Sequence, residues 1–134
     1  MTSTVNRAPG TIPSTVLIVD EDPDVRDALR LLFELEEYRV IAEASGAADA
    51  ILLAKRWQPN LVILKSEMPR MDGAATAAQI RLASRPTRIV AFSSVLSERP
   101  DWADAFLNKE RICEIAPLLT ALIPEAQESG STRC

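Results

Sequence analysis

Charged and hydroxyl side chains follow four short predicted strands of the sequence, at 16–19, 61–64, 88–92 and 105–108. In chain order they are Asp20, Glu21 and Asp22, then Lys65, then Ser93 and Ser94, then Lys109. The chain contains no histidine, which removes the commonest general base, the commonest metal ligand and the usual pH switch. The candidate site is therefore built from carboxylates, amines and hydroxyls, whose elementary interactions are ion pairs and hydrogen bonds.

The elements that position these side chains alternate between strands and helices. The runs 16–19 and 61–64 are continuously aliphatic and too short for helices, which is typical of strands buried on both faces. Further strands are predicted at 39–44, 88–92 and 105–108. One helix is predicted to begin at Pro23 and a second to end near Trp57. A third is predicted over 74–84, and a fourth is predicted to begin at Pro117. This alternation predicts an α/β fold with right-handed crossovers, a parallel sheet and helices on both faces. Active side chains of such sheets lie at the carboxyl ends of the strands.

Four stretches of the chain resemble the receiver domain of bacterial two-component response regulators. They are VLIVDEDPDVRDALR, PNLVILKSEMPRMDG, TRIVAFSS and DAFLNK, and they cover most of the predicted folded part. The resemblance implies a flavodoxin-like, doubly wound fold with a five-stranded sheet in the order 2-1-3-4-5. In that family an acidic pair after the first strand helps to bind Mg²⁺, and an aspartate that ends the third strand accepts a phosphoryl group. A Thr or Ser ends the fourth strand, and a Lys follows the fifth.

The resemblance assigns roles to particular residues of this chain. It implies an acidic pair at Asp20 and Glu21, the hydroxyl at Ser93, an aromatic switch position at Phe106, the phosphate-contacting lysine at Lys109, and a metal-shell backbone carbonyl at Glu67. Ser93 and Ser94 equally suit hydrogen bonds to the backbone at a strand end. Asp22 fits a helix cap better than a ligand, and Phe106 fits the core.

Lys65 occupies the position of the phosphoacceptor aspartate. An amine cannot form an acyl phosphate, and two carboxylates now face two ammonium groups instead of three carboxylates facing one. Mg²⁺ prefers oxygen ligands and negative charge, so its binding is expected to be lost or weak, with Asp20, Glu21 and Glu67 as vestiges of the site. We expect Lys65 to pair with Asp20 or Glu21.

The segment between the fourth and fifth strands also departs from the family. Ser93 and Lys109 are sixteen positions apart, several fewer than usual, and Pro100 lies between them. The helix of this segment is therefore predicted to shorten to about a turn or to be lost. Lys109 is followed by Glu110 instead of the family's usual proline.

Composition limits the remaining possibilities. The 134 residues, 47% hydrophobic and 25% charged, suit one globular domain over 15–124, with a flexible leader over 1–14 and a flexible tail over 125–134. A net charge of −4 disfavours nucleic acid as a partner. No apolar stretch is long enough for membrane insertion. The two cysteines, Cys113 and Cys134, favour a reduced, cytoplasmic protein in which Cys113 is buried.

These observations predict an atypical single-domain response regulator, or pseudo-receiver, that is not an enzyme and signals by phosphorylation-independent protein–protein interaction. The expected partner is a protein, and the sequence leaves open whether the chain forms a homodimer. One alternative is phosphorylation at Ser66, Ser93, Ser94 or Asp20. Another is a haloacid-dehalogenase-type phosphatase, to whose acidic motif Asp20 and Asp22 are similar. That alternative is disfavoured because Asp24 stands where a Thr or Val is usual, and because the chain leaves no room for a cap.

Overall fold

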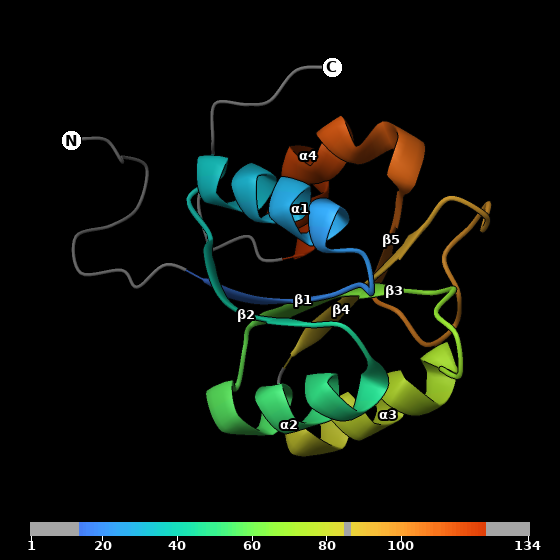
Figure 1. Cartoon of the computed structure of the whole chain (residues 1–134). Helices are drawn as coiled ribbons and strands as arrows, with labels where there is room; N and C mark the ends of the chain where they lie inside the picture. Colours follow the sequence, from blue (N-terminus) through green and yellow to red (C-terminus); the bar gives the residue numbers. More distant parts are fainter. Residues whose placement is uncertain (1–13, 85–86, 123–134) are drawn as a thin grey trace.

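Five parallel strands form one sheet in the order β2-β1-β3-β4-β5, as the computed structural model shows for residues 14–84 and 87–122 (Figure 1). The predicted flavodoxin-like fold is therefore confirmed. The elements in chain order are β1 (Thr15–Val19), α1 (Pro23–Leu35), β2 (Arg39–Ala44), α2 (Ala47–Trp57), β3 (Leu61–Lys65), α3 (Gly73–Ala83), β4 (Arg88–Ser93), β5 (Ala105–Asn108), the 3₁₀ helix η1 (Lys109–Glu114) and α4 (Ile115–Leu122).

The helices cover both faces of the sheet, with α1 and α4 on one side and α2 and α3 on the other (Figure 1). Each side has its own apolar core, and alternate residues of β1 point into the two cores, as the period of a strand requires. Val16 and Ile18 pack in the core that contains Phe33. Leu17 and Val19 pack in the other core. The sheet is thus buried on both faces, which fixes the ends of its central strands.

Capping residues set where two of the helices begin, and so shape the loops at the carboxyl edge of the sheet. The Asp22 carboxylate accepts a hydrogen bond from the backbone N–H of Asp24 at 2.9 Å, and Pro23 occupies the first turn of α1. The Asp72 carboxylate accepts from the backbone N–H of Ala75 at 3.2 Å at the start of α3. The predicted capping role of Asp22 is confirmed.

The connection between β4 and β5 contains no helix, as the short spacing predicted. Arg81 of α3 holds this connection in place. Its guanidinium donates to the carbonyl of Trp102 at 3.1 Å and pairs with Asp104 at 2.8 Å. Asp104 also accepts from the backbone N–H of Ile89 at 2.8 Å. The segment is therefore tied to α3 and to β4 by ionic and hydrogen-bonded contacts.

Trp102 lies against the first residue of α3. A Cβ atom added at Gly73 would be 2.8 Å from a carbon of the Trp102 ring, which is too close. We predict that Gly73→Ala lowers the free energy of unfolding by about 1 kcal/mol, because overpacking outweighs the better helix propensity of alanine. Urea unfolding measures this, and the loss should disappear in a Trp102→Leu background. An equal loss in both backgrounds would contradict the contact as its cause.

Three predictions about the C-terminal part of the structure are wrong. The last helix begins at Ile115, not at Pro117, because η1 leads directly into it. Cys113 is half-buried, not buried, because it lies in η1, which has no buried residue. It is disulfide-bonded, not reduced. Cys134 and the predicted leader and tail lie outside the described residues, except Ser14, which is buried.

None of the described helices has the length and apolar character needed to cross a membrane.

Candidate functional site

The carboxyl ends of β1, β3 and β4 bring most of the predicted site residues to one edge of the sheet. Asp20 and Glu21 follow β1, while Lys65 and Ser93 are the last residues of β3 and β4. Strand β3 pairs with β1 on one side and with β4 on the other. The three strand ends are therefore neighbours, so that Lys65 lies between the acidic pair and the hydroxyl.

Asp20 is fully buried, and one of its carboxylate oxygens has no partner. Oδ1 accepts a hydrogen bond from the backbone N–H of Asp22 at 2.9 Å, whereas Oδ2 is buried without a hydrogen bond. Burial raises the pKa of Asp20 because it removes water from the charged form, although the Asp22 N–H and the charge of Lys65 act in the opposite direction. The site therefore contains an incompletely solvated carboxylate.

Arg26 of α1 holds the loop that carries Asp20, and Arg30 shares with Arg26 the carboxylate of Glu43. Arg26 donates to the backbone carbonyl of Asp20 at 2.7 Å and pairs with Glu43 of β2 at 3.0 Å. Arg30 pairs with the second oxygen of Glu43 at 2.6 Å. Burial alone would raise the pKa of Glu43, but the two guanidinium groups hold it below its usual value. This network fixes the backbone on which the acidic pair stands.

Lys65 pairs with Glu21, one of the two partners expected from the sequence. The Nζ atom of Lys65 lies 3.1 Å from Oε2 of Glu21, and the two side chains are 17% and 39% exposed. Burial acts against the charged amine, but the Glu21 hydrogen bond and the charges of Asp20 and Glu21 raise the pKa of Lys65. Burial likewise acts against the Glu21 carboxylate, but its own backbone N–H and Lys65 lower its pKa. Lys65 is thus a fixed ammonium group beside both acids.

Glu67 and Ser93 form a second contact, which the sequence reasoning missed. The Ser93 hydroxyl donates to Oε2 of Glu67 at 2.6 Å and accepts from the backbone N–H groups of Val95 and Leu96, each at 2.9 Å. The contact joins loops that are 26 positions apart, so no local pattern signals it. Ser93 therefore has the strand-end role that the sequence left open, and its partner is the side-chain carboxylate of Glu67.

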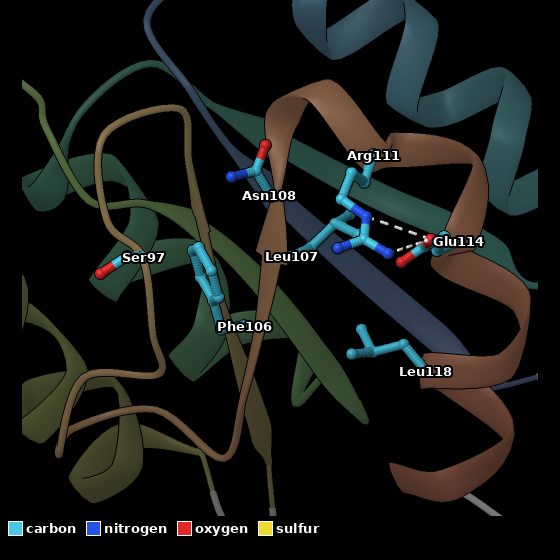
Figure 2. Close-up of a pocket in the computed structure, with 7 residues that line it drawn as sticks. All are labelled: Ser97, Phe106, Leu107, Asn108, Arg111, Glu114 and Leu118. Atoms are coloured by element: carbon cyan, nitrogen blue, oxygen red, sulfur yellow. Dashed lines mark hydrogen bonds and ion pairs between the residues drawn. The ribbon is translucent and has the colours of Figure 1, made fainter.

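Lys109 follows β5, whose last residue pairs with Ser93, so it also lies at the carboxyl edge of the sheet. Lys109 forms no ion pair with any of the described carboxylates. Phe106 was expected in the core, but it is half-buried because no helix covers the β4–β5 connection on its side. It lines an open pocket of about 240 Å³ with Ser97, Leu107 and Asn108, with Arg111 and Glu114 of η1, and with Leu118 of α4 (Figure 2).

The residues at the carboxyl edge do not fit a Mg²⁺ ion well. Among the residues that the structure describes, no three carboxylates are grouped as metal ligands. The Lys65 ammonium already neutralises Glu21 and acts electrostatically on Asp20 and Glu67. The arrangement provides an ion pair between Lys65 and Glu21 beside the buried carboxylate of Asp20.

Comparisons with known proteins agree with this fold. Residues 16–109 match the family described as the response regulator receiver domain. The chain is 33% identical over 117 residues to the nitrate/nitrite response regulator protein NarL of Escherichia coli, covering 82% of this chain and 53% of NarL. It is 36% identical over 75 residues to the virulence-factor regulator BvgA of Bordetella pertussis, covering 56% of this chain and 36% of BvgA. The chain thus spans about half of these relatives or less.

Solved structures give the same picture. The signal receiver domain of the putative response regulator NarL from Mycobacterium tuberculosis is 28% identical with a TM-score of 0.66, covering 82% of this chain and 96% of that domain. The response regulator domain of Thermotoga maritima CheB has a TM-score of 0.72 over 86% of this chain and 96% of that domain. At 23% identity, the second likeness concerns the fold alone.

Proposed function

We propose a function on the premise that this chain belongs to the response regulator receiver domain family of two-component signalling, to which residues 16–109 match. The proposed function is that of a pseudo-receiver, which signals by binding a protein partner without being phosphorylated at the end of β3. The single observation that carries the proposal is Lys65, an amine at the position where the family places its phosphoacceptor carboxylate, paired with Glu21 at 3.1 Å.

The contacts of the site support a protein that stays in one signalling state. The amine of Lys65 takes the place of the charge that a metal would otherwise supply beside Asp20 and Glu21, so we propose that Mg²⁺ is not a cofactor of the protein. The hydroxyl of Ser93 already donates to Glu67, which leaves it no proton to donate to a phosphoryl group. On this proposal the protein is not an enzyme, acts in the cytoplasm, and depends on the concentration of its partner.

Phosphorylation elsewhere in the site is the second candidate, and the burial of the candidate groups favours one of them. Asp20 and Ser93 are buried, and the hydroxyl of Ser66 is buried as well. Ser94 is exposed and is therefore the residue that a kinase could reach. The haloacid-dehalogenase alternative gains no support, because Asp22 caps α1.

Acetyl phosphate tests the proposal directly. We expect that incubation with acetyl phosphate and Mg²⁺ adds no phosphoryl group, because the chain has an amine where an acyl phosphate would form. Intact-mass spectrometry is the measurement, and a receiver domain with an aspartate at the end of its third strand is the positive control. A stoichiometric, acid-stable but alkali-labile phosphoryl adduct on this chain would overturn the proposal. A Ser94 phosphate formed only with a kinase would instead favour the second candidate.

A further inference from the structure

Helices α2 and α3 lie on the side of the sheet opposite α1 and α4 (Figure 1). Their outer side exposes apolar side chains. Leu52 of α2 is 65% exposed and Leu82 of α3 is 76% exposed. Ala48, Ala75 and Ala78 are exposed around them. Between the helices lies an open groove of about 340 Å³, lined by Ile51, Lys55, Gln79, Leu82 and Ala83. We call this surface the α2–α3 face.

Helix α3 lacks the charged outer side that a solvent-facing helix usually has. Its one charged residue is Arg81, whose guanidinium is bound to Asp104 and to the carbonyl of Trp102. The remaining exposed side chains of α3 are alanines, Gln79 and Leu82. The α2–α3 face therefore exposes apolar area that no other described part of the chain covers.

The three charged residues of helix α2, Asp49, Lys55 and Arg56, form no ion pair within the described part of the chain. Arg56 lies over the Trp57 ring at 5.2 Å. At about 100° per residue, Asp49 and Arg56 fall on the same flank of α2, on either side of Leu52 along the axis. Lys55 falls on the other flank, beside the groove.

We propose that the α2–α3 face binds a second copy of this chain, with the two α2 helices antiparallel and a two-fold axis beside Leu52. The axis brings Leu52 next to Leu52 of the second copy. It also places Asp49 of one copy opposite Arg56 of the other, on the same flank of the paired helices. Along the helix axis the two residues are offset by only about the rise of one residue. A two-fold contact repeats this pair, so that two ion pairs flank the leucines.

The same two-fold axis places a large side chain on α3 of one copy opposite a small side chain on α3 of the other. Ala75 and Leu82 both lie on the outer side of α3 and are seven positions apart. When two α3 helices face each other antiparallel, Leu82 of each copy meets the small surface at Ala75 of the other. A large side chain opposite a small one lets two helices approach closely. Charge and shape thus agree on the same arrangement.

The expected dimer is weak. Each helix has 11 residues and is therefore about 16 Å long, so the face is small for a specific interface. The net charge of −4 on each copy also opposes association. We therefore expect a dimer that forms and dissociates with protein concentration.

Sedimentation velocity over a concentration series tests the proposal with the whole chain. The wild type should shift from monomer to dimer as its concentration rises. Leu82→Glu and Leu52→Glu should each raise the dimer dissociation constant by at least about tenfold. Leu31→Glu is the matched control, because Leu31 is 60% exposed on α1, on the other side of the sheet. Circular dichroism checks that every variant is folded.

A charge exchange tests the orientation of the two copies. Asp49→Arg and Arg56→Asp should each weaken the dimer, and the double variant should restore it, because the ion pairs then form with reversed sign. A wild type that stays monomeric throughout the series overturns the proposal. A dimer that Leu31→Glu weakens and Leu82→Glu does not also overturns it, as does a double variant weaker than both single variants.

Discussion

Lys65→Asp is expected to bind Mg²⁺ much more tightly than the wild type. Lys65 Nζ lies 3.1 Å from Glu21 and acts electrostatically on Asp20 and Glu67, so a metal placed among these acids would meet an ammonium group. The substitution changes the charge at this position by two units. Two unit charges at 4 Å interact by about 1 kcal/mol even in bulk water, so a divalent ion gains about 4 kcal/mol. That corresponds to about a thousandfold in affinity.

The fixed position of Asp20 should favour Mg²⁺ binding once Lys65 is replaced by aspartate. Arg26 fixes the carbonyl of Asp20, and Oδ2 of Asp20 is buried without a hydrogen-bond partner. Such an oxygen gains the most from a cation, because it has already lost its water. The substitution should therefore restore a site and not merely add negative charge.

Isothermal titration calorimetry with MgCl₂ is the measurement for the Lys65→Asp variant. Lys55→Asp is the matched control, since it makes the same charge change on exposed α2, far from the carboxyl edge of the sheet. Mg²⁺ should also raise the melting temperature of Lys65→Asp but not of Lys55→Asp. Equal binding by both variants, or by neither, would mean that the acids around position 65 do not form a preorganised site.

Most element bounds could be predicted from the local sequence pattern, because burial on both faces leaves a strong signal, whereas the strand order came from the resemblance of four stretches to the receiver domain. Runs such as 61–64 are apolar at every position, and residues such as Pro23 limit where helices begin. The start of the last helix was missed because η1 precedes it and Pro117 suits the first turn of any helix. A proline marks where a helix is able to start, not where it does.

Within the site, the sequence could predict only those residues whose position is set directly by the end of a strand. The pairing of Lys65 was expected with Asp20 or Glu21, and the choice of Glu21 depends on which carboxylate stays accessible. The hydrogen bond between Glu67 and Ser93 joins two loops whose paths no periodicity reveals. Phe106 was expected in the core because aromatic residues on strands usually pack there. The loss of the helix between β4 and β5 leaves it half-exposed.

Lys65→Met is expected to destabilise the protein at neutral pH by about 2 kcal/mol, between the values for a hydrated and a buried ion pair. The intermediate value follows from the unequal burial of the two acids. Glu21 is 39% exposed and can be hydrated again once the amine is gone. Asp20 is fully buried, so without Lys65 its charge loses a compensating cation.

The loss should shrink as the pH falls, and the pKa shifts give the sign. Glu21 has a lowered pKa in the folded protein, so its contribution exists above its usual pKa and is lost as the pH falls through the lowered value. Asp20 has a raised pKa, so its burial costs stability as the pH rises from its usual pKa through the raised value. Lys65 reduces that cost, and at low pH both acids are protonated, so that the amine has little left to stabilise.

Urea unfolding of the wild type and Lys65→Met between about pH 3 and pH 8, a range that spans the usual carboxyl values, measures this dependence. Asp20→Asn supplies the matched background, because it removes the buried charge and keeps an oxygen to accept from the backbone N–H of Asp22. In that background Lys65→Met should cost less than about 1 kcal/mol, the scale of an exposed pair. A loss that is the same at all pH values, or that persists undiminished with Asp20→Asn, would show that methionine disturbs packing and that Lys65 does not compensate the buried carboxylate.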